Sequence, residues 1–323
     1  MGASSNGCAL DTSLKPRLRY GAMTLDWPRI AVLGAGAVGC YFGGLLARAG
    51  APVTLIGRAN HVEAVAAKGL FLESRDFRGY IPVSASTDVA AASGADIVLF
   101  CVKTVDTEDA ARLLRPHVAS SALVVSLQNG VDNVERIRSA SGIEAIPSVV
   151  YVAAEMTGPG RLKHNGRGDL VVEAENVAAI FRRAGIPCVI STNIEGELWM
   201  KLITNCAYNA ISALARSKYL PIIDDPGMRD VMIEAVKETI AVASAAGVQL
   251  PPVDPVETTL KLARAMPGAI SSTAQDLARG RRTEIDSLNG YVARRGAELR
   301  VPTPVNHTLH ALVKLLEQNT NAG

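Results

Sequence analysis

The chain has 323 residues, a formal net charge of +2 and 4% aromatic residues. Because a single hydrophobic core stops growing at about 250 to 300 residues, we expect two domains. The near-neutral charge and the few aromatic side chains argue against a nucleic-acid partner, which needs a basic face or a stacking platform.

The amino-terminal residues 1–26 are polar and hold no apolar run that could serve as the core of a signal peptide, so we expect a flexible tail. The cysteines are odd in number, scattered and without a C-x-x-C pair, a pattern typical of reduced thiols in the cytoplasm. They are Cys8, Cys40, Cys101, Cys188 and Cys206. His307 and His310 have no third ligand at suitable spacing, so the sequence predicts no metal site.

Residues 29–58 read RIAVLGAGAVGCYFGGLLARAGAPVTLIGR and predict a strand, a tight turn, a helix and a second strand. The turn fits the G-x-G-x-x-G pattern, whose glycines allow the turn, the approach of a pyrophosphate and close packing of helix on strand. A dinucleotide would bind at the helix amino terminus, where unpaired N–H groups and the helix dipole favour an anion. The predicted cofactor-binding turn is Gly34, Ala35, Gly36, Ala37, Val38 and Gly39.

The same stretch has an alternative interpretation. Residues 30–47 carry no charge and are just long enough to be taken for a membrane span. The glycines and the strand-like run that follows them favour a βαβ unit, and we expect no membrane association.

The end of the second strand indicates which dinucleotide is bound. NAD-binding folds normally carry an acid about 20 residues after the glycines, where it holds the ribose hydroxyls. Here the strand runs into Gly57 and Arg58, and an arginine can bind a 2′-phosphate through two parallel hydrogen bonds. Lys103 follows another apolar strand, at the sheet edge where such folds bind ligands. The predicted cofactor is NADP(H); the alternative is that both side chains are merely solvated.

The first half alternates strands and helices, as in a Rossmann-type α/β domain over residues 27–193. Asn129 stands at a further strand end. We expect helices at 61–68, 131–138 and 177–184, strands at 70–73, 80–83, 95–102, 123–127, 146–156, 170–173 and 188–190, and a glycine-rich hairpin between the strands 146–156 and 170–173. From residue 194 the periodicity is helical, so residues 194–323 should form an all-helical domain.

Lys201, Asn205 and Asn209 recur every four positions in an otherwise apolar helical segment and form one polar stripe. Such a stripe suits neither a core nor an open surface, so we expect it in a cleft against the first domain. Reduction of a carbonyl leaves charge on its oxygen, which needs a proton donor within hydrogen-bond reach. Lysine can be that donor, because burial lowers its pKa.

Residues 269–289 carry Ser272 and Glu284, which on one straight helix would lie ~18 Å apart, too far to serve one small substrate. A break at Gly280 would bring them together. Near Lys201, Glu284 would hold the ammonium or accept a substrate hydroxyl. The alternative is a surface ion pair with Arg281 or Arg282.

Five segments share the order and spacing of one known family: GAGAVG, SLQNGV, LWMKLITNCAYN, SSTAQD and TEIDSLNGYV. Over almost all of residues 29–316 the chain resembles the ketopantoate reductase family. The resemblance implies NADPH-dependent reduction of 2-dehydropantoate (ketopantoate) to (R)-pantoate, on the route to pantothenate and coenzyme A. It also implies that Lys201 is the catalytic acid and Glu284 its partner.

The resemblance further assigns binding roles. Substrate contacts would come from Asn129, Asn205, Asn209 and Ser272, and cofactor contacts from Arg58, Lys103 and Asn129. The chain departs from the family pattern at Ala210, Ala269, Thr273 and Ala274, all on the substrate side. One alternative is therefore a reductase of another small 2-oxo acid, and a second is an NADPH-sensing protein without turnover. The many apolar positions of the helical half predict a homodimer.

Overall fold

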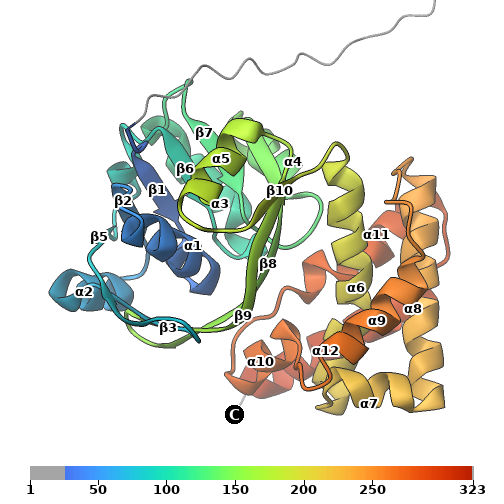
Figure 1. The fold of residues 1–323 in the computed structure, drawn as a ribbon. Coiled ribbons are helices and arrows are strands. Elements are labelled where there is room, and N and C mark those ends of the chain that lie inside the picture. Colours follow the sequence, from blue (N-terminus) through green and yellow to red (C-terminus); the bar gives the residue numbers. More distant parts are fainter. Residues whose placement is uncertain (1–25, 322–323) are drawn as a thin grey trace, which may run out of the picture.

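The computed structural model describes residues 26–321, in which a mixed sheet covered by helices is followed by helices alone (Figure 1). The expected tail at residues 1–26 lies outside the described residues, apart from Asp26. The predicted fold class, a Rossmann-type α/β domain followed by an all-helical one, is confirmed.

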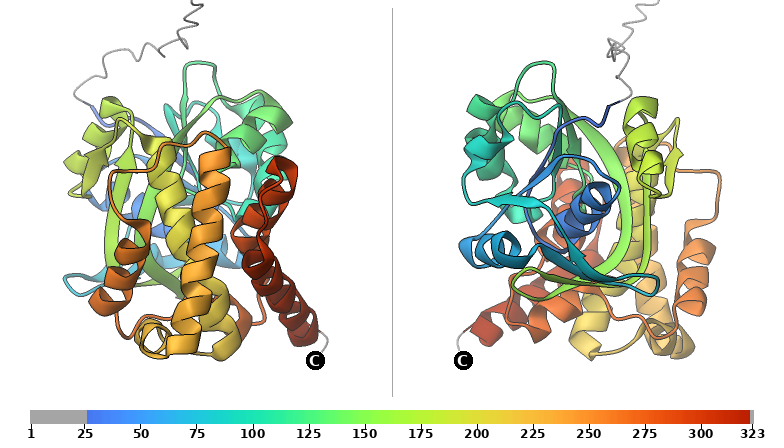
Figure 2. Two further views of the ribbon diagram at one scale, coloured as in Figure 1. Left: turned by 90° about the vertical axis from the view of Figure 1, so that its right-hand side faces the viewer. Right: turned by 60° about the vertical axis from the view of Figure 1, so that its left-hand side comes forward.

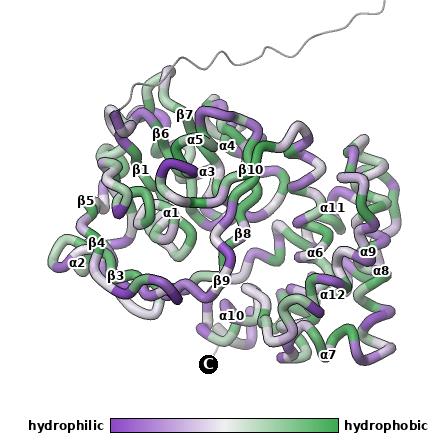
Figure 3. The backbone as a smooth tube through the Cα atoms, in the orientation of Figure 1, coloured by the Kyte–Doolittle hydropathy of each residue, from purple (hydrophilic) through white to green (hydrophobic). Residues whose placement is uncertain are grey.

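Six parallel strands in the order β5-β2-β1-β6-β7-β8 form the dinucleotide-binding type of sheet, in which the strand order reverses beside β1. Their bounds are β1 (Ile30–Leu33), β2 (Val53–Ile56), β5 (Ser84–Ser86), β6 (Ile97–Phe100), β7 (Leu123–Ser126) and β8 (Ala145–Gly158). The middle strands are hydrophobic along their length because helices cover both of their faces (Figure 3).

Beyond β8 the sheet turns back on itself. The antiparallel partner of β8 is β9, which also pairs with β3 and β10, and β4 forms the edge beside β3. The bounds are β3 (Leu70–Glu73), β4 (Arg78–Ile81), β9 (Arg161–Val172) and β10 (Cys188–Ile190). In two views this part curves beneath helix α1 (Ala37–Arg48) (Figures 1 and 2).

Helix α1 is therefore enclosed on two sides. A Cβ at Gly43 would lie 2.9 Å from a methyl group of Val32 on β1, and a Cβ at Gly44 would lie 2.8 Å from a methyl group of Leu70 on β3. The small residues let the sheet approach closely on both sides, and a single hydrophobic core includes α1, β1 and β9.

Two predicted elements have other bounds than expected. The expected hairpin is present, but its turn is tight, and β9 already begins at Arg161 and continues through Gly166 and Gly168. Glycine lowers strand propensity, but long pairing with β8, interrupted by bulges, keeps the chain extended. Only the first two residues of the expected strand at 80–83 lie in a strand, at the end of β4, because Pro82 lacks an N–H group and ends the pairing there.

Four further helices accompany the sheet: α2 (Ala59–Lys68), α3 (Thr107–Leu114), α4 (Asn133–Ser141) and α5 (Glu175–Arg183). Short 3₁₀ segments are η1 (Val89–Ala92), η2 (Thr104–Asp106) and η3 (Arg115–His117). No helix within residues 26–321 is both long and apolar enough to cross a membrane, and the uncharged run 30–47 is a strand, a turn and a helix.

The second part packs around a long central helix (Figure 2). Its elements are α6 (Ile194–Ala215), α7 (Tyr219–Asp224), α8 (Pro226–Ala245), α9 (Pro255–Ala265), α10 (Ser272–Ala278), η4 (Ile285–Ser287), α11 (Asn289–Leu299) and α12 (Pro304–Asn321). The predicted break at Gly280 is confirmed, since α10 ends at Ala278 and Gly280 has a φ of +60°.

Candidate functional site

Strand β1 leads directly into the predicted dinucleotide turn. Gly34 has a φ of +109°, and a Cβ there would lie 2.6 Å from the carbonyl carbon of Cys101, so no side chain fits. A Cβ at Gly39 would overlap the carbonyl oxygen of Gly34, whereas one at Gly36 would meet no atom within 4 Å. Helix α1 has no side-chain cap and no acid in its first turn, which leaves its N–H groups for an anion. The turn fits a pyrophosphate.

The end of β2 carries no acid. Gly57 packs tightly on the turn, since a Cβ there would lie 2.6 Å from the Cβ of Ala35. Arg58 is exposed and forms no ion pair with any described residue. Burial lowers the pKa of His61, and the positive charges of Arg281 and Arg58 lower it further. An arginine of the helical half therefore lies in the same neighbourhood as Arg58, which the sequence did not indicate.

Lys103 joins the two halves of the molecule. Its Nζ donates to Asp276 Oδ2 at 2.9 Å and to the carbonyl oxygen of Arg282 at 2.9 Å. Burial raises the pKa of Asp276, and the hydrogen bond from Lys103 opposes that rise. The strand-end lysine thus contacts α10 and the segment after it.

Helix α6 carries the polar stripe into the junction. Asn193 caps the helix by accepting a hydrogen bond from the Gly196 N–H at 3.1 Å, which fixes where the helix begins. Lys201 Nζ donates to Asn129 Oδ1 at 2.7 Å and also to the carbonyl oxygen of Val150. An ammonium has three N–H groups, so one remains for a ligand. Burial lowers the pKa of Lys201 to about 8, although the charge of Glu284 opposes this.

Glu284 is the second charged group at this point. The N–H and hydroxyl of Thr104 donate to its Oε1 at 3.0 Å and 3.1 Å, and Asn129 Nδ2 donates to its Oε2 at 3.0 Å. The alternative of an ion pair with Arg281 or Arg282 was wrong, because none of the contacts of Glu284 among the described residues is with an arginine. Glu284 lies near Lys201 but reaches it through Asn129.

Sequence reasoning did not identify Thr104 or Val150 as neighbours of the site, and it named Arg281 only as a possible ion-pair partner of Glu284. Val150 acts through its carbonyl group and Thr104 partly through its N–H, for which side-chain identity gives no signal, although the Thr104 hydroxyl also donates to Glu284. Arg281 could have been suspected only from its sequence proximity to Glu284.

The remaining stripe residues have free amides. Asn209 is buried, Asn205 is partly buried, and neither side chain makes a hydrogen bond to the described residues. Ser271 caps α10 and donates to the carbonyl oxygen of Asn209 at 3.1 Å, which brings the exposed Ser272 to that end of the stripe. The free amides and this hydroxyl are available to a ligand.

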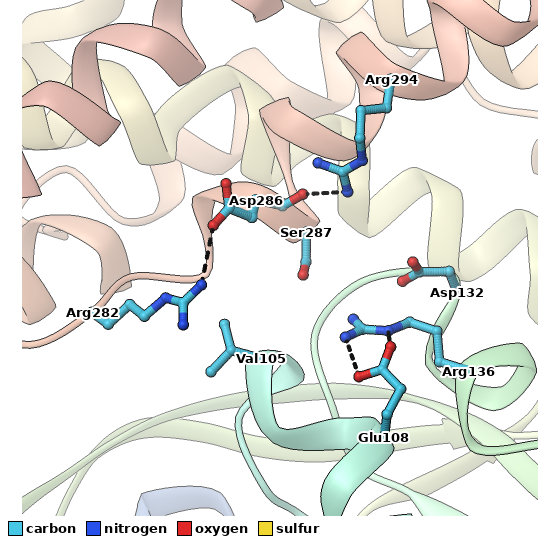
Figure 4. Close-up of a pocket in the computed structure, with 8 residues that line it drawn as sticks. All are labelled: Val105, Glu108, Asp132, Arg136, Arg282, Asp286, Ser287 and Arg294. Atoms are coloured by element: carbon cyan, nitrogen blue, oxygen red, sulfur yellow. Dashed lines mark hydrogen bonds and ion pairs between the residues drawn. The ribbon is translucent and has the colours of Figure 1, made fainter. Parts of the chain in front are cut away.

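A separate cavity of about 320 Å³ lies between the two halves (Figure 4). Arg136 and Glu108 form a bidentate pair on one side, at 2.7 Å and 2.8 Å, and Arg294 donates to the carbonyl oxygen of Asp286 at 2.8 Å on the other. Asp132 Oδ1 is buried there without a hydrogen-bond partner among the described residues. None of the predicted site residues lines this cavity.

The weaker candidates have structural explanations. His310 contacts Asp286 Oδ1 at 2.7 Å, and His307 is exposed. No group of three His, Cys, Asp or Glu side chains within residues 26–321 could hold a metal ion. The four described cysteines are free thiols, Cys206 is buried in the core, and Cys8 lies outside the described residues.

Comparison with known proteins agrees with this architecture. The family model described as ketopantoate reductase PanE/ApbA matches residues 30–176, and its C-terminal counterpart matches residues 193–317. A 2-dehydropantoate 2-reductase of Pyrococcus horikoshii is 33% identical over 298 residues, covering 90% of this chain and 97% of that protein.

Solved structures extend the likeness. A PanE/ApbA family ketopantoate reductase from Ralstonia eutropha JMP134 is 51% identical with a TM-score of 0.87, covering 90% of this chain and 99% of that one. D-mandelate dehydrogenase, solved with NADH and anilino(oxo)acetate, is 23% identical with a TM-score of 0.83, covering 91% and 99% of the two chains, a likeness of fold alone. Since both halves match the same family, the chain belongs to the ketopantoate reductase family, a family of dinucleotide-dependent oxidoreductases.

Proposed function

We propose that the chain reduces 2-dehydropantoate to (R)-pantoate with NADPH. The observation that carries the proposal is the hydrogen-bonded series from Lys201 through Asn129 to Glu284. This series joins a helix of the second half to the strand ends of the first, where a dinucleotide-binding fold places its ligand. Membership of the family supports the same reaction.

The cofactor would be held by the turn from Gly34 to Gly39 at the amino terminus of α1, together with Arg58, Lys103 and Asn129. Bound NADPH supplies a hydride to the C2 carbonyl carbon. The unpaired Arg58 and the nearby Arg281 favour a 2′-phosphate, and no acid at the end of β2 repels one. Lys103 would reach the cofactor by exchanging its contact with Asp276.

Lys201 would donate the proton to the carbonyl oxygen. Its pKa of about 8 lies near the working range of an acid at neutral pH. Asn129 and Val150 hold two of its N–H groups and leave the third for the substrate oxygen. Glu284 stabilises the charged form of the lysine.

The substrate would lie along the polar stripe. Asn205 and Asn209 have amides without partners among the described residues, suited to the oxygens of a hydroxylated 2-oxo acid. Ser272 would bind the carboxylate. The substituted positions Ala210, Ala269, Thr273 and Ala274 favour one alternative, the reduction of another small 2-oxo acid by the same residues.

The decisive assay is NADPH oxidation by the purified protein with ketopantoate, run beside NADH and several other 2-oxo acids. Turnover with ketopantoate and NADPH is expected. Turnover with another 2-oxo acid but not with ketopantoate would mean that the same residues reduce that acid instead. Cofactor binding without oxidation by any acid would favour the NADPH-sensing alternative.

We also propose a cytoplasmic homodimer whose NADP-binding part spans residues 27–193 and whose substrate part spans residues 194–323. The free thiols fit the cytoplasm, and the exposed Leu312 and Leu315 on α12 are suited to an interface between copies. A monomer in sedimentation experiments would contradict the dimer.

A further inference from the structure

Strand β9 contains an unusual backbone segment that none of the roles above uses. Gly166, Arg167 and Gly168 have φ values of +152°, +54° and +133°, and Arg167 is one of three non-glycine residues with positive φ within residues 26–321. The pairing register with β8 shifts between Tyr151 and Val152, opposite this segment. Strained backbone in a bulge commonly aims a side chain at a functional site.

The segment fixes the guanidinium of Arg167 on an aromatic ring. The Arg167 carbon Cζ lies 3.9 Å from the ring centroid of Tyr151. Its Nε and Nη2 donate to the two carboxylate oxygens of Asp169 at 3.0 Å and 2.6 Å. A Cβ at Gly168 would overlap the hydroxyl of Tyr41 on α1, so the bulge fits closely against the helix that follows the dinucleotide turn. The guanidinium therefore has one defined orientation.

Tyr151 in turn contacts the lysine of the site. Lys201 Nζ lies 5.6 Å from the ring centroid of Tyr151, and the preceding residue, Val150, accepts a hydrogen bond from the same Nζ. One side of the ammonium is thus formed by two consecutive residues of β8, opposite the bulge of β9. Cations stacked on an aromatic ring are held by its electron-rich face.

We propose that Arg167 is a positioning residue for carbonyl reduction, which with Asp169 holds the Tyr151 ring and, through it, the ammonium of Lys201. The inference rests on the proposed function of Lys201 as the proton donor. The charged groups that act on the pKa of Lys201 are Glu284 from the segment before η4 and Arg167 and Asp169 from β9. Arg167 lowers the pKa of Lys201, while Glu284 and Asp169 raise it.

The test uses three variants and a matched control. Arg167→Gln removes the charge, Arg167→Lys keeps the charge but loses the planar stack, and Asp169→Asn removes the opposite charge. Arg161→Gln is the control, because Arg161 lies on the same strand with its Cζ 4.1 Å from the ring centroid of Phe71. Each protein is labelled with acetic anhydride across a pH series, and the modification of Lys201 is measured by mass spectrometry.

The labelling midpoint of Lys201 should move to higher pH in Arg167→Gln and to lower pH in Asp169→Asn, and stay in place in Arg161→Gln. With NADPH and ketopantoate, kcat should fall about tenfold in Arg167→Gln and Arg167→Lys, since a small displacement of a catalytic group is costly, while the KM for NADPH is unchanged. Arg167→Lys should keep the wild-type labelling midpoint because it keeps the charge. A fall in kcat in this variant would therefore report the lost positioning and not the lost charge.

The inference would be overturned if neither the labelling midpoint of Lys201 nor kcat changed in Arg167→Gln. It would also be overturned if kcat fell equally in Arg161→Gln. If the wild-type protein oxidises no NADPH with any 2-oxo acid, the proposed function fails, yet the labelling midpoints still report whether Arg167 and Asp169 act on Lys201.

Discussion

Lys201 and Glu284 are joined through a single amide, because Asn129 accepts from the ammonium through Oδ1 and donates to the carboxylate through Nδ2. An asparagine can do both at once, whereas an ionised aspartate in its place has no N–H group and would lose the contact with Glu284. The arrangement orients the lysine while keeping the carboxylate from neutralising it by direct contact.

Replacing Lys201 by alanine should lower kcat by about 10²- to 10⁴-fold, the usual contribution of a general acid. The dissociation constant of NADPH, measured by fluorescence titration, should stay close to that of the wild type, because the turn after β1 is untouched. Lys163→Ala, an exposed lysine on β9, is the control. Ordinary turnover in Lys201→Ala would remove Lys201 from the proposed mechanism.

The pH dependence of kcat should have an alkaline limb near pH 8, because Lys201 must be protonated to donate and its pKa is lowered to about 8. Glu284 raises that pKa, so Glu284→Gln should move the limb to lower pH. A pH–rate profile of both proteins checks the sign. A limb that stays in place or moves upward in Glu284→Gln would contradict the electrostatic role of the carboxylate.

Arg58→Ala should raise the KM for NADPH by about 10- to 100-fold, the loss expected for hydrogen bonds to a phosphate dianion. The KM for NADH should be unaffected, since NADH lacks the 2′-phosphate. Arg75→Ala, an exposed arginine paired with Asp76, is the matched control. If the KM rose equally for NADPH and NADH, Arg58 would stabilise the site rather than select the cofactor.

The glycines of the turn should separate folding from binding. Gly36→Ala should fold with a near-normal melting temperature but lose NADPH affinity, because its Cβ enters open space where a phosphate would lie. Gly39→Ala should lower the melting temperature, since its Cβ overlaps the Gly34 carbonyl oxygen. Normal NADPH affinity in Gly36→Ala would exclude close approach of the pyrophosphate at that glycine.

The sequence predicted the elements whose signal is local. The strand at 188–190 was predicted from its apolar run, and the break was predicted from Gly280 itself. Only the end of β9 was predicted, at residues 170–173, because Gly166 and Gly168 look like loop residues until β8 pairs with them.

The side chains of the candidate site could be predicted from the sequence, but the hydrogen bonds between them could not. Periodicity puts Lys201, Asn205 and Asn209 on one face of a helix. No local pattern could show that the N–H of Thr104, about 180 residues away in the chain, fixes Glu284, because that contact depends on how the two halves pack.

The enclosure of α1 has a consequence for synthesis of the chain. The helix and its first cover, β1 and β2, lie within the first 56 residues, but β9, which covers the opposite side, ends only at Val172. Strand β3 packs on that side as well, but until β9 has been translated it has only β4 beside it, so the cover of α1 stays incomplete. Contacts so distant in sequence slow folding, and a nascent chain arrested before β9 exposes a surface suited to chaperone binding.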